Sequence, residues 1–222
     1  MDKNVIVTGA SGNLGKAVSK TFSNDGYTVF ELIHKNHPLI KVEDNNWQGG
    51  VDLQNQAATS NMISEIIAIQ PMISTLICTT GGYVPGNIEN TNSSQILEQV
   101  KLNFITAFNT VQPVLAKMKK QGYGKIFLTG SRPGMDIKQG YNSVAYAFSK
   151  SLIFQLAQLL NDEYKSHGLS TWVIVPGTID TPQNRIAMPG QDFSKWVSPF
   201  TIAEKVLQYC KEPGDSNMLI NF

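Results

Sequence analysis

Cysteine and histidine are scarce in this sequence: its 222 residues include two Cys and three His. Cys78 and Cys210 form no C-x-x-C pair, and no histidine stands near either of them at the spacing of metal ligands. The sequence therefore gives no support for a metal site. We expect two reduced thiols in a cytoplasmic protein.

Strong charge and long apolar runs are missing as well. The net charge is +1, and Lys and Arg are spread along the chain, so there is no electrostatic reason to expect nucleic-acid binding. No segment approaches the roughly 18 uninterrupted apolar residues of a membrane helix. The opening MDKN shows no signal-peptide pattern. We expect neither a nucleic-acid nor a membrane partner.

What the sequence does contain is an alternation of short β-branched runs and helical patterns. Strands are predicted at 4–9, 27–33, 49–53, 73–80, 124–130, 170–177 and 217–221. Helices are predicted at 14–26, from after the third strand to about 70, and at 93–121, 143–167 and 199–211. The polar stretch between 33 and 49 is expected to be a loop. This alternation predicts an α/β protein: one domain, 1–222, with a doubly wound parallel sheet of about seven strands and helices on both faces.

Three glycines in VTGASGNLG mark the turn between the first strand and the first helix. Gly9, Gly12 and Gly15 are spaced three apart. Glycine permits positive φ and a close backbone approach, and a helix N-terminus supplies N–H donors to a phosphate. The turn predicts a dinucleotide cradle that also includes Ser11, Asn13 and Leu14, although a tight strand–helix turn alone would also use glycines.

The end of the second strand bears on which dinucleotide is bound. The acidic residue that grips the adenosine ribose in NAD proteins normally stands there, but Ile33 holds the position and His34 and Lys35 follow. Glu31 lies two residues earlier on the same strand face, too deep for this role. A missing carboxylate followed by a cation suits a 2′-phosphate, so NADP(H) is favoured over NAD(H).

The segment YAFSK places Tyr146 and Lys150 four apart, on one face of a predicted helix. A free phenol near pKa 10 is a weak acid–base at neutral pH. A nearby cation stabilises the phenolate and is expected to draw its pKa toward the working range. The competing interpretation is an ordinary surface pair.

These motifs resemble those of the short-chain dehydrogenase/reductase (SDR) family, which implies a Rossmann-like fold. Asn13 stands where many members have the middle glycine of T-G-x-x-x-G-x-G. The resemblance implies a catalytic tetrad in which Tyr146 transfers the proton and Lys150 binds the nicotinamide ribose. Ser131 hydrogen-bonds the substrate oxygen, and Asn103 holds a water of the proton relay. The fifteen-residue step from Ser131 to Tyr146 is about two longer than usual, which predicts a short insertion.

The same resemblance assigns further cofactor contacts and an assembly. The cofactor contacts follow the third, fourth and sixth strands: Asp52, Leu53, Thr80, Gly81, Gly82, Pro176, Gly177, Thr178, Ile179 and Thr181. Family members commonly pair through the two long helices, so a homodimer or homotetramer is expected. The apolar helix residues Phe104, Phe108, Phe154, Leu156 and Leu160 belong either to that interface or to the core.

The segment DTPQNRIAMPGQDFSKW is similar to a run of dihydropteridine reductases, T-P-x-N-R-x-x-M-P followed by D-F-S-x-W. CTTGGYVPGN also resembles their C-x-x-G-G-aromatic turn. This likeness predicts a substrate lid loop at 183–196, with Tyr83, Met188 and Trp196 against a flat ring. Ser131 and Asn103 favour ordinary carbonyl reduction instead.

The resulting prediction is an NAD(P)H-dependent oxidoreductase that transfers a hydride to a C=O or C=N bond of a small-molecule substrate. A quinonoid dihydropterin is the leading specific hypothesis. One alternative is a non-catalytic NADP(H)-binding regulatory protein, which should lack Tyr146 or Lys150. Sugar-nucleotide epimerases share the glycine spacing but usually carry a longer C-terminal substrate domain.

Overall fold

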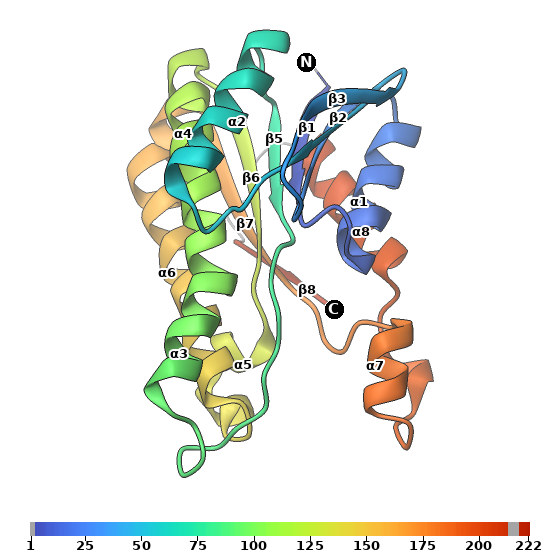
Figure 1. The fold of residues 1–222 in the computed structure, drawn as a ribbon, viewed down its shortest axis with the longest axis vertical. Coiled ribbons are helices and arrows are strands. Elements are labelled where there is room, and N and C mark those ends of the chain that lie inside the picture. The colour runs from blue at the N-terminus through green and yellow to red at the C-terminus, as the bar shows by residue number, and fades with distance from the viewer. Residues whose placement is uncertain (1–2, 213–217) are drawn as a thin grey trace.

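The fold is built on one sheet of eight strands, seen in a computed structural model that describes residues 3–212 and 218–222 (Figure 1). The strand order is β3-β4-β2-β1-β5-β6-β7-β8. The strands are β1 Asn4–Thr8, β2 Thr28–Ile33, β3 His37–Glu43, β4 Asn46–Gly50, β5 Thr75–Cys78, β6 Gly124–Thr129, β7 Leu169–Val175 and β8 Leu219–Asn221. Every neighbouring pair is parallel except β3–β4.

Helices cover both faces of this sheet. The α-helices are α1 Asn13–Asn24, α2 Gln56–Ile69, α3 Ser93–Val100, α4 Thr106–Gln121, α5 Arg132–Met135, α6 Val144–Tyr164, α7 Pro182–Ala187 and α8 Pro199–Lys211. Shorter turns are the π-helix η1 Lys101–Ile105 and the 3₁₀ segments η2 Ile137–Gly140, η3 Lys165–His167 and η4 Phe193–Lys195. Helices α2, α4 and α6 lie on one face and α1 and α8 on the other (Figure 1). The predicted doubly wound α/β class is confirmed.

The apolar strand residues divide between two cores because side chains alternate across a sheet. In β1, Ile6 packs with α2, α4 and α6, whereas Val5 and Val7 face α1 and α8. All five residues of β1 are buried. A central parallel strand covered on both faces is apolar throughout, which is why these strands were evident in the sequence.

The polar stretch after β2 is not the expected loop. It contains β3 and most of β4, an antiparallel hairpin at the edge of the sheet. Only one side of this edge strand has a partner, and Ile40 and Val42 are 48% and 46% exposed. The strand therefore needs few apolar residues, and no strong alternation marked it in the sequence. The sheet gains its eighth strand here.

Three other predicted elements differ in detail. The helix expected at 93–121 is interrupted by the π-helix η1. The lid expected as a loop at 183–196 contains most of α7 and all of η4. The strand expected at 217–221 begins outside the described residues, and β8 is seen from Leu219.

The sequence did not decide whether five apolar helix residues belong to the core or to an interface, and the structure shows the surroundings of each. Leu156 and Leu160 are buried in the core, and Phe104 and Phe154 pack partly against it. Phe108 is exposed. No helix of the described residues is long and apolar enough to span a membrane. Within the same ranges, no group of three or more His, Cys, Asp and Glu side chains is placed to hold a metal ion.

Candidate active site

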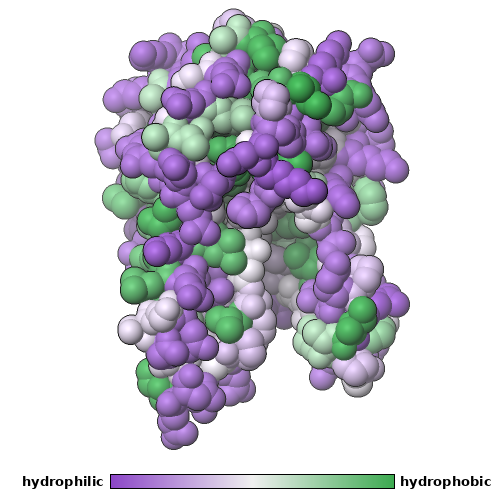
Figure 2. Space-filling model, viewed as in Figure 1, coloured by the Kyte–Doolittle hydropathy of each residue, from purple (hydrophilic) through white to green (hydrophobic). Residues whose placement is uncertain are grey.

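The segments that follow β1, β5, β6 and β7 meet at one edge of the sheet, because the carboxyl ends of parallel strands lie together. Figure 2 shows the molecule hollowed below this edge, between the part that carries α3 and α5 and the part that carries α7. Most of the predicted site residues belong to these four segments.

The glycines of the first turn serve two different purposes. Gly9 has a φ of +66°, and a Cβ there would come within 2.8 Å of the Thr80 nitrogen. A Cβ on Gly15 would stand 2.2 Å from the Gly9 carbonyl oxygen. At Gly12 the nearest atom would be 3.3 Å away, and its φ is an ordinary −80°. The fold itself requires Gly9 and Gly15, whereas a Cβ on Gly12 would make one close contact, with the Gly9 carbonyl oxygen, at an ordinary φ.

A cavity of about 320 Å³ opens beside this turn. Its walls are Gly9, Ser11, Gly12, Leu32, Ile33, His34, Val51, Asp52, Leu53, Gln54, Thr79, Thr80, Gly81, Leu102 and Thr106. The Thr80 hydroxyl is buried without a hydrogen-bond partner among the described residues. A buried polar atom with no partner is uncommon and indicates a group that a ligand satisfies. The apolar walls, the glycine turn and this hydroxyl fit the adenosine half of a dinucleotide.

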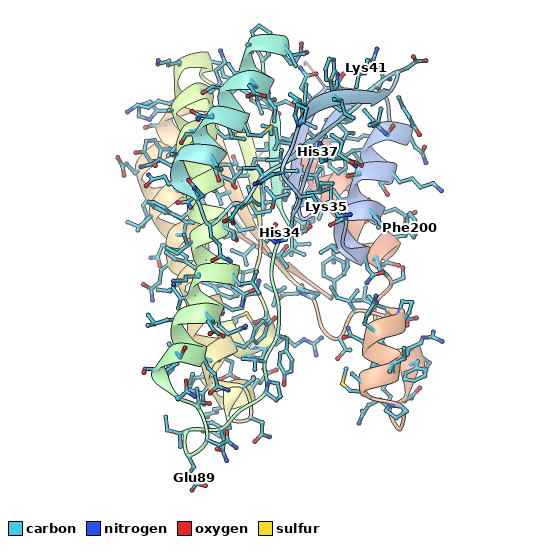
Figure 3. The ribbon with its side chains drawn as sticks, viewed as in Figure 1. His34, Lys35, His37, Lys41, Glu89 and Phe200 are labelled. Atoms are coloured by element: carbon cyan, nitrogen blue, oxygen red, sulfur yellow. The ribbon has the colours of Figure 1, made fainter. Side chains whose placement is uncertain are left out.

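The residues at the end of β2 occupy the places that the sequence indicated. Glu31 is not among the residues that line the cavity, and its carboxylate accepts a hydrogen bond of 2.9 Å from the Gln48 amide on β4. His34 lines the cavity, and Lys35 follows it beyond the end of the strand (Figure 3). Asp52 also lines the cavity, and its carboxylate accepts a hydrogen bond of 3.0 Å from the Gln54 backbone nitrogen.

Asn103 lies within the π-helix η1, and its side chain is 1% exposed. Its Oδ1 accepts from the Gly82 backbone nitrogen at 2.9 Å, and its Nδ2 lies 3.0 Å from the Gly82 carbonyl. The same Nδ2 lies 3.0 Å from Gln99 Oε1 and from Ser149 Oγ. A π-turn inside an α-helix is rare and is often found at functional sites. Gln99 and Ser149 were not anticipated, because nothing in their local sequence marks them.

The predicted pair of Tyr146 and Lys150 is brought together with Ser131. The Ser131 hydroxyl lies close enough to the Tyr146 phenol to lower the pKa of that phenol against the effect of burial. The Lys150 Nζ lies 6.0 Å from the centre of the Tyr146 ring and donates to the Thr129 carbonyl at 2.7 Å. Tyr83 meets the Tyr146 ring edge-on, with centroids 5.1 Å apart. Four of the predicted residues thus form one cluster.

The expected lowering of the Tyr146 pKa by Lys150 does not hold in this structure. Burial raises the pKa of Tyr146, the hydrogen bond from Ser131 works against that rise, and the charge of Tyr83 adds to it. Lys150 is turned toward the Thr129 carbonyl, and burial lowers its own pKa to about 8. Desolvation is the largest cause of both shifts.

Backbone hydrogen bonds join the two ends of the segment from Thr178 to Val197, and further contacts form within it. Asp180 N donates to the Val197 carbonyl at 2.8 Å, and Val197 N donates to Thr178 at 3.1 Å. The Arg185 guanidinium pairs with Asp180 and lies 4.8 Å from the centre of the Phe193 ring.

The apolar residues of this segment have different surroundings, since Ile179 and Val197 pack against the core. Phe193 packs on Trp196 with ring centroids 4.7 Å apart. Ile186 is 81% exposed and Met188 is 36% exposed. An amide–amide hydrogen bond of 2.9 Å from Asn13 to Gln183 joins the segment to the glycine turn.

A sequence model described as "short chain dehydrogenase" matches residues 3–191. The chain belongs to the short-chain dehydrogenase family. Dihydropteridine reductase of Dictyostelium discoideum is 27% identical over 215 residues, which cover 94% of this chain and 88% of that protein. Dehydrogenase/reductase SDR family member 7B of Danio rerio is 29% identical over 238 residues, covering 96% of this chain and 76% of that protein.

Solved SDR structures share the fold. ElxO with NADP bound has a TM-score of 0.88 at 18% identity, covering 100% of this chain and 97% of its own. The ligand-free aldohexose dehydrogenase of Thermoplasma acidophilum has a TM-score of 0.82 at 22% identity, covering 99% and 92%. The SDR family consists of oxidoreductases that bind NAD(P)(H) and act on small molecules.

The two glycine roles predict different outcomes for the same substitution. Gly15→Ala forces a Cβ onto the Gly9 carbonyl and should lower the free energy of unfolding by about 1–3 kcal/mol. Gly12→Ala should leave the melting temperature near that of the parent while weakening dinucleotide binding about tenfold. Thermal melts and titration with NADPH measure both. Equal loss of stability in the two variants would contradict this assignment.

Replacement of the buried Lys150 is expected to raise the free energy of unfolding. Its pKa is about 8 in the folded chain, against 10.5 for an ordinary lysine, so the unfolded chain holds the proton more tightly. The destabilisation that comes from burying the charged ammonium is fully present below about pH 8 and disappears as the pH approaches 10.5. The free energy of unfolding of Lys150→Met should therefore be about 1–3 kcal/mol higher than that of the parent at pH 7.

That gain should shrink as the pH rises from 8 toward 10.5, as followed by urea denaturation. Lys120→Met, at an exposed lysine near the end of α4, is the matched control and should show no such trend. A Lys150→Met variant that is no more stable than the parent at pH 7 would overturn the expectation.

Proposed function

We propose that this chain is an NAD(P)H-dependent reductase that transfers a hydride to a C=O or C=N bond, with Asn103, Ser131, Tyr146 and Lys150 as its catalytic residues. The observation that carries the proposal is the cluster of buried Ser131, buried Lys150 and half-buried Tyr146 next to the nucleotide-sized cavity. A bound nicotinamide cofactor supplies the hydride. The rest of the reaction is proton transfer and positioning by the protein.

In this proposal Tyr146 donates the proton. Burial raises its pKa, so the phenol keeps its proton at neutral pH, which is the form that a reduction requires at the outset. Ser131 bonds the phenol and polarises the oxygen or nitrogen of the acceptor. Lys150 is buried beside them, where its ammonium favours the phenolate left after proton transfer and reaches a ribose hydroxyl. Asn103 holds the Gly82 backbone and positions a water of the proton relay.

The proposed cofactor contacts follow the carboxyl edge of the sheet. The turn residues Gly9, Ser11, Gly12, Asn13, Leu14 and Gly15 hold the pyrophosphate at the N-terminus of α1. Asp52, Leu53 and Thr80 surround the adenosine. The nicotinamide is assigned to Gly81, Gly82, Lys150 and the turn formed by Pro176, Gly177, Thr178, Ile179 and Thr181.

NADP(H) is the proposed cofactor. Glu31 is not among the residues that line the cavity, and its carboxylate accepts a hydrogen bond from Gln48 on the neighbouring strand, so it is not placed to bind a ribose hydroxyl there. His34 lines the cavity and Lys35 lies next to it. Both can donate to a phosphate oxygen.

A quinonoid dihydropterin is the proposed acceptor. The support is the dihydropteridine reductase relative and the likeness of the 180–196 segment to such enzymes. The exposed ring of Tyr83 beside Tyr146, together with Met188 and Trp196 of the lid at 183–196, offers surfaces for a flat heterocycle.

We also propose a homodimer or homotetramer through α4 and α6, where Phe108, Phe148 and Leu159 are exposed.

Replacement of the phenol decides between an enzyme and a regulatory protein. Tyr146→Phe should reduce NADPH oxidation with quinonoid dihydropterin about 10²–10⁴-fold, because the proton donor is lost. Its affinity for NADPH, measured by fluorescence titration, should stay near that of the parent.

Two other results would change the conclusion. No turnover by the parent with the pterin, but turnover with a carbonyl panel, removes the pterin as substrate. No turnover with any acceptor favours the non-catalytic NADP(H)-binding regulator.

Lys35 is the residue proposed to give a preference for NADPH over NADH. Lys35→Ala removes a cation from the proposed 2′-phosphate site and should raise KM for NADPH about tenfold. KM for NADH should not change, because NADH has a hydroxyl there. Steady-state rates with both cofactors measure this, and an equal effect on NADH would exclude the assignment.

A further inference from the structure

The short loop between β4 and α2 forms one wall of the cavity beside the glycine turn. Asp52, Leu53 and Gln54 all line that cavity. The first two were assigned above to the adenosine. The loop has few residues, since β4 ends at Gly50 and α2 begins at Gln56. Its conformation therefore decides where the Asp52 carboxylate lies.

A buried asparagine on α4 holds this loop from outside. Asn109 is 4% exposed and follows Thr106, which also lines the cavity, by three residues on the same helix. Its Nδ2 donates to the Leu53 carbonyl at 2.9 Å and to the Gln54 carbonyl at 3.2 Å. A side-chain amide has two N–H groups. Both are therefore used on consecutive carbonyls of the loop.

The two peptide groups that Asn109 holds are bonded to Asp52 at their other ends. The Gln54 nitrogen donates to Asp52 Oδ1 at 3.0 Å, and the Asn55 nitrogen donates to the Asp52 carbonyl at 3.0 Å. Leu53 C=O and Gln54 N–H share one peptide, and Gln54 C=O and Asn55 N–H share the next. A peptide group is planar, so a constraint on its oxygen also sets the direction of its N–H. Asn109 thus acts on Asp52 through two rigid units, one at the carboxylate and one at the main chain.

Two other amide links of the same kind do not reach the cavity wall. Gln112, three residues further along α4, accepts a hydrogen bond of 2.8 Å from the exposed amide of Gln56. Asn161 on α6 bonds the backbone nitrogen and the carbonyl of Thr171, each at 2.8 Å. Neither Gln56 nor Thr171 lines the cavity. These links provide matched controls for Asn109.

A carboxylate fixed in the wall of a base-binding cavity recognises an N–H donor, because an ionised carboxyl group only accepts hydrogen bonds. The 6-amino group of adenine is such a donor. The 6-oxo group of hypoxanthine is an acceptor and would set its oxygen against the carboxylate. A site built to bond an N–H strongly rejects an analogue that lacks it. This discrimination requires that the carboxylate keep its direction.

We propose that Asn109 is a positioning residue that fixes the Asp52 carboxylate and thereby selects a cofactor whose base carries a 6-amino group. The inference rests on the proposed function, because it takes this cavity as the adenosine site. Asn109 does not line the cavity and acts only through the loop.

A matched pair of cofactors tests the proposal: NADPH and deamino-NADPH, in which hypoxanthine replaces adenine. Nicotinamide fluorescence gives the Kd of each without any acceptor. The parent should bind NADPH about tenfold more tightly than the deamino form. Asn109→Leu has a similar size but no donors, so it should raise Kd for NADPH about five- to tenfold and affect the deamino form less. Asp52→Asn should reduce the preference as well, because its amide can donate to the 6-oxo group.

The controls separate positioning from a general loss of stability. Gln112→Leu and Asn161→Leu should leave both Kd values near those of the parent, even where thermal melts show that the variant is less stable. Asn109→Ser offers a smaller polar side chain with one donor, which can hold at most one of the two carbonyls. It should also lower the preference for NADPH, and it replaces Asn109→Leu if that variant does not fold.

Binding and turnover answer separate questions here. If no acceptor is reduced, the proposed reaction fails, and a preference for NADPH that Asn109→Leu abolishes still supports the role of Asn109. A parent that binds both cofactors equally, or that binds neither, overturns the inference. So do Asn109 variants that retain the parental preference.

Discussion

The arrangement of the site depends on one buried amide. Asn103 joins the π-helix η1 to the Gly82 backbone after β5 and to Ser149 on α6. Ser149 in turn donates to the Tyr146 carbonyl at 2.8 Å. An amide buried in this way must be hydrogen-bonded, since an unpaired buried polar group costs about 1–3 kcal/mol. The π-turn that brings Asn103 to this position is therefore maintained by its side-chain bonds, and the same bonds fix the helix that carries Tyr146 and Lys150.

Burial shifts the pKa values of both titratable groups of the candidate site. A desolvated ammonium at Lys150 has a lowered pKa, and a desolvated phenol at Tyr146 has a raised one, so each is held in its neutral form more than in water. Desolvation also strengthens any interaction between them, because charges attract more strongly where water is excluded. Strained or desolvated groups persist when the surrounding structure fixes them. Here that structure is the Asn103 network and the Thr129 carbonyl that receives Lys150.

The parts predicted from the sequence are those governed by local chemistry. Gly9 and Gly15 are required by the turn they form, and the spacing of Tyr146 and Lys150 is a property of one helix. Buried strands such as β1 are apolar on both faces, which the sequence displays directly. The β3–β4 hairpin was missed because an edge strand with one partner needs no continuous apolar run. The contacts of Asn103 with Ser149 and of Arg132 with Phe222 join residues 46 and 90 positions apart, and no local pattern encodes such pairs.

The segment from Thr178 to Val197 touches two parts of the candidate site: the glycine turn after β1 and the cavity that Trp196 lines. Met188 and Trp196 of this segment were expected to lie against a flat ring, and Phe193 contacts both Trp196 and the Arg185 guanidinium. Two backbone hydrogen bonds at Val197 join the ends of this segment. The segment contacts the glycine turn through Gln183, which accepts from Asn13, and its Trp196 lines a cavity of about 230 Å³ together with Arg132 and Gly177. A displacement of this one segment would therefore alter both the glycine turn and that cavity.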